Sequence, residues 1–191
     1  MKMLNIMIVG VGGQGSLLAS RILGSLFTAS GLEVKLSEVH GMAQRGGSVV
    51  TYIRAGESVA SPLIDRGQAD VIISFEEAEA MRYLPWLKKD GTVIVNIQHI
   101  LPMPVLTGAA QYPEHIVDTM RSLGAKVIAF DALSASMEAG SPKCANVALL
   151  GAAASVIGHT AEEWQAALAA TIKPKLLDLN LKAFALGQQA G

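Results

Sequence analysis

The feature that most constrains this chain is an uncharged apolar run, residues 6–9, that leads directly into a glycine-rich stretch. Apolar runs of this kind are typical of a strand buried on both faces of a parallel sheet. A helical pattern with Leu18 and Ile22 on one face begins at once. The stretch between them contains Gly10, Gly12, Gly13, Gln14 and Gly15. The N-terminus therefore predicts a strand, a tight turn and a helix.

Gly10, Gly12 and Gly15 have the G-x-G-x-x-G spacing. Glycines at these positions let the chain turn sharply, let its backbone approach a ligand and let helix and strand pack closely. The free N–H groups and dipole of the helix start favour an anion such as a phosphate. A tight turn needs glycine for steric reasons even without a ligand, so the motif alone leaves both interpretations open.

The composition restricts the classes of partner. Charged residues make up 16% of the 191 residues, against about 25% in typical domains, so we expect a surface buried against another chain. The net charge of −1 argues against a nucleic-acid binder. Cys144 is the single cysteine, which excludes an internal disulfide and a cluster held by several thiolates. We find neither an export signal nor a membrane span, and expect a cytoplasmic chain that forms a homodimer when isolated.

The remaining pattern predicts an α/β fold. Further strands are expected at residues 32–39, 48–54, 69–75, 92–96 and 125–130, with an irregular surface excursion at residues 97–113. From residue 132 onward the pattern is helical, with a capping box at Thr160 and Glu163 and a helix opening at Pro174. We predict one domain, residues 1–191, with a Rossmann-like, mostly parallel sheet, helices on both faces and a helical C-terminal region.

A second glycine-rich loop follows the predicted strand at residues 32–39. It contains His40, Gly41, Gln44, Arg45, Gly46 and Gly47. If the two strands are parallel neighbours, both loops lie at the carboxyl edge of the sheet and face one another. Arg45 offers a bidentate contact to a phosphate or carboxylate, and His40 a hydrogen bond. A simple ion pair between Arg45 and Glu38 is an equally good explanation.

These loops define the candidate site. Its predicted cofactor-binding residues are Gly10, Gly12, Gly13, Gln14, Gly15, His40, Gln44, Arg45 and Gly46. We predict no catalytic residue and no metal ligand in this chain. Lys143 and Asn146, at a helix start, are weaker candidates for a site or an interface. The alternative is a nucleotide-binding domain or NAD(P)-dependent enzyme in which Glu38 holds a ribose hydroxyl; a third reading is a structural subunit without a ligand.

Three segments carry a resemblance to a known family. They are the glycine turn at residues 10–15, the loop Ser37-Glu-Val-His-Gly-Met-Ala-Gln-Arg-Gly-Gly-Ser48, and Lys143-Cys-Ala-Asn146. Together they resemble the gamma-type component of 2-oxoacid:ferredoxin oxidoreductases, and most closely the small (beta) subunits of the indolepyruvate branch. The similarity extends over nearly the whole chain, and the second loop is its most specific part.

The resemblance implies a subunit of a complex that oxidatively decarboxylates a 2-oxoacid, here an arylpyruvate, with coenzyme A. The products would be an acyl-CoA, carbon dioxide and reduced ferredoxin. It further implies that thiamine diphosphate, magnesium and iron–sulfur clusters belong to a large partner subunit, through which the complex meets ferredoxin. The isolated chain is then expected to be inactive, since it has no thiamine-diphosphate motif and no cluster cysteines.

Overall fold

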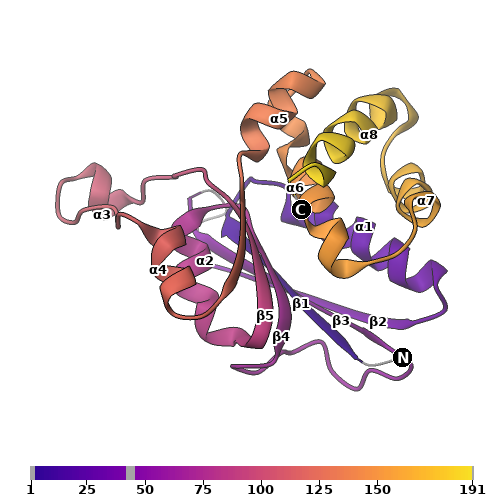
Figure 1. The fold of residues 1–191 in the computed structure, drawn as a ribbon, viewed down its shortest axis with the longest axis horizontal. Helices are drawn as coiled ribbons and strands as arrows, with labels where there is room; N and C mark the ends of the chain where they lie inside the picture. The colour runs from indigo at the N-terminus through magenta and orange to yellow at the C-terminus, as the bar shows by residue number, and fades with distance from the viewer. Residues whose placement is uncertain (1–2, 42–45, 191) are drawn as a thin grey trace.

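The computed structural model describes residues 3–41 and 46–190, and within them six strands form one sheet in the order β2-β3-β1-β4-β5-β6 (Figure 1). Strands β1, β4, β5 and β6 pair in parallel, whereas β3 is antiparallel to both β1 and β2. The predicted, mostly parallel α/β sheet is confirmed. The strands are β1 (Leu4–Val11), β2 (Glu33–His40), β3 (Ser48–Gly56), β4 (Ala69–Ser74), β5 (Leu87–Asn96) and β6 (Lys126–Phe130).

Helices cover both faces of the sheet, as predicted. In Figure 1, α2 and α4 lie on one side, and α1 lies on the other with α6, α7 and α8. The α-helices are α1 (Ser16–Ala29), α2 (Glu77–Tyr83), α3 (Met103–Leu106), α4 (Ile116–Ser122), α5 (Ala132–Ala139), α6 (Ala145–Ile157), α7 (Ala161–Thr171) and α8 (Pro174–Gln188). Short 3₁₀ turns, η1 (Leu84–Trp86) and η2 (Pro142–Cys144), precede β5 and α6.

The alternation of side chains along β1 explains the two-faced packing. Ile6 and Ile8 belong to the core under α1 and α6, whereas Met7 and Val9 belong to the core under α2 and α4. All four side chains are fully buried. Because successive residues of a strand point to opposite faces, a continuous apolar run is what a strand covered on both sides requires.

One expectation about the sheet is wrong. We expected the strand at residues 32–39 to be the neighbour of β1, but β3 lies between β2 and β1 and pairs with both. Only residues 41–47 connect β2 to β3, too few for the crossover helix that parallel neighbours need. The more apolar β3 takes the inner position, and β2 becomes an edge strand with Leu36 and Val39 exposed.

The C-terminal helices form a close-packed layer on the sheet. Helix α6 buries most of its residues, and α8 packs directly against it. At Gly151 a Cβ atom would lie 2.1 Å from the carbonyl oxygen of Phe184, and at Gly187 one would lie 1.9 Å from that of Ala148. Glycine at both positions is therefore what lets the two helix backbones approach.

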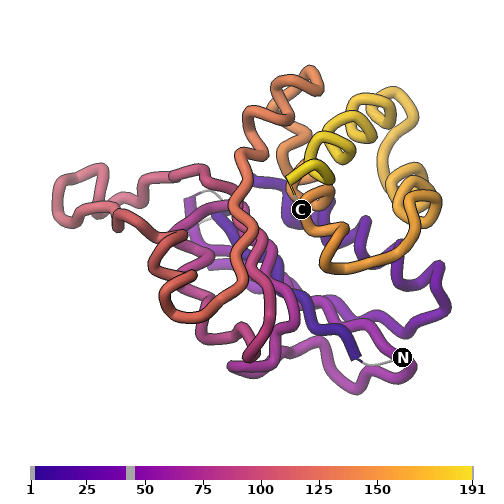
Figure 2. Tube along the Cα trace, viewed as in Figure 1, coloured from indigo at the N-terminus to yellow at the C-terminus, as the bar shows by residue number. Residues whose placement is uncertain are grey.

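Residues 97–113 leave the end of β5, carry the short helix α3, and project from the body of the molecule before α4 begins (Figures 1 and 2). We call this segment the projecting arm. Both chain ends lie away from α3, the N-terminus at the far end of the sheet and the C-terminus among the helices α6 and α8. Across the described residues no helix has both the length and the apolar character that crossing a membrane would demand.

Candidate functional site

The two glycine-rich loops meet at the end of β1. The N–H of Gly12 donates a 2.9 Å hydrogen bond to the carbonyl of Gly47, the residue before β3. Gly13 and Gly15 have φ angles of +101° and +89°, which L side chains rarely adopt. The turn after β1 therefore lies against the loop before β3, although the strand pairing that joins them differs from our prediction.

The predicted site residues have different environments. Gly12, Gly13, Gly15 and His40 line a common pocket. Gly10 lies beneath the turn, where a Cβ atom would come within 2.8 Å of Gln14 Oε1. Gly46 adopts a φ of +77° in the second loop and is not among that pocket's lining residues. Gln44 and Arg45 lie outside the described residues, so their part in the site stays a prediction.

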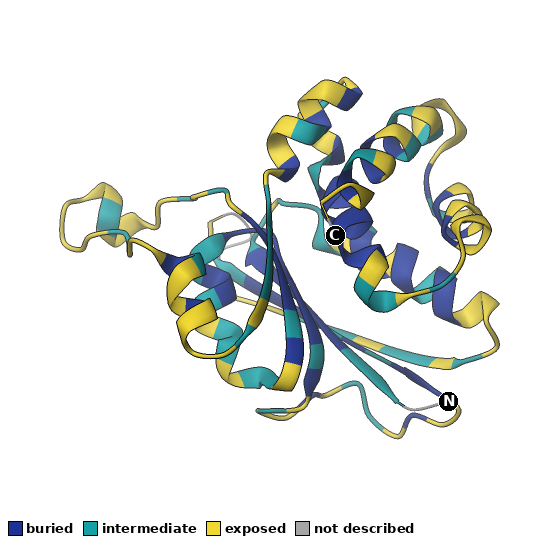
Figure 3. Cartoon of the chain, in the orientation of Figure 1, coloured by how far each residue is buried: buried dark blue, intermediate teal, exposed yellow. Residues whose placement is uncertain are grey.

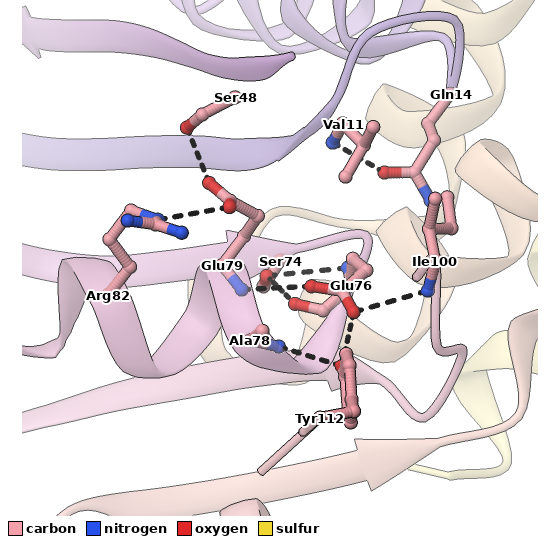
Figure 4. Close-up of polar contacts among 10 residues, drawn as sticks. All are labelled: Val11, Gln14, Ser48, Ser74, Glu76, Ala78, Glu79, Arg82, Ile100 and Tyr112. Atoms are coloured by element: carbon pink, nitrogen blue, oxygen red, sulfur yellow. Dashed lines mark hydrogen bonds and ion pairs between the residues drawn. The ribbon is translucent and has the colours of Figure 1, made fainter. Parts of the chain in front are cut away.

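Gln14 fixes the glycine turn to the neighbouring strand. Its Oε1 accepts a 2.7 Å hydrogen bond from the N–H of Val11 (Figure 4). Its Nε2 donates a 2.9 Å bond to the carbonyl of Phe75, just beyond β4. The side chain thus closes the turn and ties it to the end of the adjacent parallel strand. Gln14 organises the backbone that would meet a ligand.

The first pocket, of about 390 Å³, lies on the side of β2 and β3. Its acidic group is Glu38, whose Oε2 accepts hydrogen bonds from Ser16 Oγ at 3.2 Å and Thr51 Oγ1 at 3.1 Å. A carboxylate here suits the positive end of the α1 dipole. The same negative charge opposes a bound anion, so an anionic ligand in this pocket would need a nearby cation.

A second pocket, of about 510 Å³, lies on the other side of the same turn, toward β4, β5 and α6. Lys143 is its charged lining residue, and no Asp or Glu is among the described residues that line it. The full lining is Gly13, Gln14, Gly15, Phe75, Asn96, Gln98, Leu133, Pro142, Lys143, Ala145 and Asn146. The charge of this pocket is therefore positive, in contrast to the first.

Asn146 holds the turn from the side of α6. Its Nδ2 donates a 3.2 Å hydrogen bond to the carbonyl of Gly15, and its Oδ1 accepts a 2.9 Å bond from the N–H of Val147. A Cβ atom at Gly15 would lie 2.5 Å from Asn146 Nδ2. Lys143 and Asn146, the weaker candidates from the sequence, thus lie directly beside the glycine turn.

The start of α1 presents backbone donors toward these pockets. Within the described residues, no acceptor is paired with the N–H groups of Gly13, Gly15 and Ser16. No side chain of the described chain caps α1 either, and its N-cap residue is Gly15. Unpaired N–H groups at a helix start, with an ammonium group close by, are a suitable arrangement for an anionic oxygen.

A buried polar cluster lies beside the site at the end of β4 (Figure 4). The Glu76 carboxylate, 1% exposed, accepts hydrogen bonds from the N–H of Glu79 at 2.9 Å, the N–H of Ile100 at 3.3 Å and the hydroxyl of Tyr112. Burial, together with the neighbouring Glu76, raises the pKa of Tyr112 well above 10. This cluster joins the projecting arm to α2.

Glu79 extends the polar cluster toward β3. It accepts a 2.5 Å hydrogen bond from Ser48 Oγ and forms a 3.0 Å ion pair with Arg82 Nε. The acidic residues at the start of α2 were not among the site residues that we predicted from the sequence. Their role in holding β3 and the arm was missed, as was the placement of Asn96 and Gln98 in the second pocket.

The described residues contain no group of three or more His, Cys, Asp or Glu side chains arranged to hold a metal ion. Cys144 is buried and unbonded, and burial raises the pKa of its thiol. A buried thiol with a raised pKa is a poor nucleophile. The backbone donors of the glycine turn and Lys143 suit the binding of an anionic group.

The chain is similar to known oxidoreductase subunits in sequence and in fold. The chain is 44% identical to the indolepyruvate oxidoreductase subunit IorB of Thermococcus kodakarensis, over 100% of this chain and 96% of that protein. Its fold is similar to the pyruvate oxidoreductase subunit PORC of Thermotoga maritima, with a TM-score of 0.76, 21% identity and coverage of 100% and 97% of the two chains.

A third relative has the same fold inside a longer chain. This is the 2-oxoglutarate:ferredoxin oxidoreductase of Magnetococcus marinus, solved with 2-oxoglutarate, coenzyme A and succinyl-CoA bound. The TM-score is 0.73 at 19% identity, and the match covers 100% of this chain but 31% of that one. The family model described as pyruvate ferredoxin/flavodoxin oxidoreductase matches residues 5–190. This chain therefore belongs to the pyruvate ferredoxin/flavodoxin oxidoreductase family, as the resemblance in its three sequence segments implied.

Proposed function

We propose that this chain is the small subunit of an oxidoreductase that decarboxylates an arylpyruvate such as indolepyruvate. The complex would form an acyl-CoA and carbon dioxide and pass electrons to ferredoxin. The observation that carries the proposal is the 44% identity to an indolepyruvate oxidoreductase subunit over essentially the full length of both chains. The second glycine loop, the most specific part of the resemblance in the sequence, agrees with that choice.

In this proposal a large partner subunit supplies the redox chemistry. Thiamine diphosphate, magnesium and iron–sulfur clusters are assigned to that partner, because a chain with one cysteine cannot provide the thiolates of a cluster. When bound, thiamine diphosphate stabilises the carbanion formed on loss of carbon dioxide. The small subunit contributes binding and positioning, and ferredoxin meets the complex through the partner.

The contribution of this chain is contact with the phosphate-bearing part of coenzyme A. Two features support that role: the N–H groups of Gly13, Gly15 and Ser16, which have no acceptor among the described residues, and Lys143, which lines the second pocket with Gly13 and Gly15. His40, Gln44, Arg45 and Gly46 would complete the site from the second loop. Arg45 would also offset the charge of Glu38, which otherwise opposes an anion in the first pocket.

Reconstitution tests this proposal. The purified chain and the purified large subunit are assayed alone and mixed, with indolepyruvate, coenzyme A and ferredoxin. We expect turnover only in the mixture, and lower kcat/KM with pyruvate or 2-oxoglutarate than with indolepyruvate. Reduction of ferredoxin or NAD by the isolated small chain with any 2-oxoacid would contradict the proposal. A mixture that prefers pyruvate would contradict the assignment to arylpyruvates.

A further inference from the structure

The projecting arm, residues 97–113, is a long uncharged segment on the surface. It contains no Asp, Glu, Lys or Arg, and apart from the single turn α3 it is irregular. Connections of this length in compact domains are uncommon and are usually functional. Its lack of charged residues distinguishes it from an ordinary solvent-exposed loop.

The tip of the arm is largely exposed (Figure 3), and its exposed residues include large apolar ones. Met103 is 68% exposed and Leu106 is 62% exposed, and Ile97 and Leu101 are exposed as well. Scattered apolar residues on a surface are normal, but Met103 and Leu106 lie three positions apart on α3, where they form an apolar patch in an uncharged segment. Depletion of charge is the property that marks the buried centre of protein interfaces.

The base of the arm is held firmly against the body. Glu76 accepts hydrogen bonds from Tyr112 and from the N–H of Ile100. The ring of His99 stacks on that of Tyr112 with centroids 4.6 Å apart, and His99 Nε2 lies 3.2 Å from Glu77 Oε2. The segments at the two ends of the arm, residues 99–100 and Tyr112, are thus both attached to the start of α2.

The tip has its own internal hydrogen bonds. The N–H groups of Ala109 and Ala110 donate to the carbonyl of Pro104 at 2.8 and 3.0 Å, and Thr107 Oγ1 donates to the carbonyl of Met103 at 3.0 Å. A tip that is already ordered loses less conformational entropy on binding. The apolar patch is therefore presented in a fixed shape on a fixed base.

We infer that the projecting arm docks into an uncharged, apolar groove of the large oxidoreductase subunit. Two observations favour that occupant over a second copy of this chain. Gln98, at the start of the arm, lines the second pocket beside the glycine turn, so a partner covering the arm also borders the candidate site. In the 2-oxoglutarate:ferredoxin oxidoreductase the same fold makes up 31% of a longer chain, so there it is joined to a larger part of that oxidoreductase chain.

This inference rests on the proposed function, since it requires the large subunit. The test uses the full-length chain with Met103→Glu and Leu106→Glu together, which place charge in the patch without touching the base. The matched control is Leu63→Glu, at an apolar side chain 58% exposed in the connection between β3 and β4. Affinity for immobilised large subunit is measured by interferometry, and melting temperatures verify that the variants fold.

We expect the arm variant to bind at least about a hundredfold more weakly than wild type, because anchor side chains at the centre of an interface dominate affinity. The control should stay within about threefold of wild type. Equal binding of wild type and arm variant would overturn the inference and leave the proposed function intact. If the wild-type chain does not bind the large subunit at all, the proposed function is contradicted, and the inference about the arm is contradicted with it.

Light scattering on the isolated chain supplies the remaining outcome. If the wild-type chain self-associates and the double variant is monomeric, while both bind the large subunit equally, the arm pairs copies of this chain and the inference is overturned. If the large subunit binds only chains with an intact arm, whatever their self-association, the inference stands.

Discussion

The side-chain amide of Asn146 donates a hydrogen bond to the carbonyl of Gly15, which lies 131 positions earlier in the chain. The bond joins the start of α6 to the start of α1, so the C-terminal helical layer holds the glycine turn in place. Asn146 is 5% exposed, and its nitrogen occupies the space that a side chain on Gly15 would need. The turn and the helix are therefore coupled in stability as well as in position.

This coupling predicts that Gly15→Ala is more destabilising than Gly13→Ala. Both residues have positive φ, and alanine pays about 1–2 kcal/mol for that conformation at either position. Only Gly15 also faces Asn146, whereas a Cβ atom at Gly13 would have no neighbour within 4 Å. We expect Gly15→Ala to lose about 1–3 kcal/mol more free energy of unfolding, measured by urea denaturation. Equal losses would contradict the coupling.

The close approach of α6 and α8 gives a stronger prediction. Gly151→Ala would place a methyl group 2.1 Å from the carbonyl oxygen of Phe184, and the helices must separate. We expect a loss of about 3 kcal/mol or more in the free energy of unfolding. Gly24→Ala in α1 is the control, since its Cβ would meet only a Leu36 methyl at 3.3 Å. That control should be neutral or gain up to about 1 kcal/mol.

Tyr112→Phe tests the attachment of the arm. The hydroxyl donates to the buried Glu76 carboxylate, so its removal should cost about 1.5–3 kcal/mol in the free energy of unfolding. Burial and Glu76 raise the pKa of Tyr112 above 10 in the folded chain. The stability that this proton provides is complete below pH 10 and is lost as the pH rises further, because the unfolded chain then ionises first.

Thermal denaturation at a series of pH values measures this effect. Above pH 10 the wild-type chain should lose stability more steeply than Tyr112→Phe. The difference in stability between the two proteins should therefore become smaller. The pKa of Tyr52 is also raised by burial. Because Tyr52 is present in both proteins, its effect on the pH dependence of stability cancels in the comparison. A difference in stability that stays constant or grows from pH 9 to pH 11 would show that the pKa of Tyr112 is not raised in the folded chain.

Much of this fold followed from the sequence because its signals are local. The apolar run of β1 and the glycines after it predicted a buried strand and a tight turn, and the capping box at Thr160 and Glu163 is present at α7. The order of the strands did not follow, because β2 looks like a parallel neighbour of β1 until the short connection to β3 is considered. Strand order depends on pairing partners far apart in sequence.

The glycine turn and the nearness of the second loop were the predictable parts of the candidate site. Gly12, Gly13, Gly15 and His40 share a pocket, and the two loops are joined by the bond from Gly12 to Gly47. Lys143 and Asn146 were only weaker candidates in the sequence, because the helix start that brings them to the glycine turn is far away along the chain. The anchoring role of Glu76 was hidden because a buried carboxylate looks the same in sequence as an exposed one.

The environment of Glu38 argues against the NAD(P) alternative. Its Oε2 accepts hydrogen bonds from Ser16 and Thr51 of the same chain, and its strand β2 is separated from β1 by β3 instead of lying beside β1 as in the dinucleotide-binding arrangement. We expect NAD to leave the melting temperature of the isolated chain unchanged. A ligand at a hundred times its Kd would add about 2.7 kcal/mol, so an increase of several degrees at millimolar NAD would restore that alternative.

The central claim is that this subunit contacts the phosphates of coenzyme A, and the apparent KM for coenzyme A in the reconstituted complex tests it most directly. A charge-assisted contact contributes about 1.5–3 kcal/mol, or roughly ten- to over a hundredfold in affinity. Arg45→Ala should therefore raise this KM by about that factor, with kcat at saturating coenzyme A and affinity for the large subunit unchanged. Arg121→Ala, at the exposed end of α4, is the control and should change neither. An unchanged KM together with weaker association would contradict the claim and leave Arg45 as an interface residue.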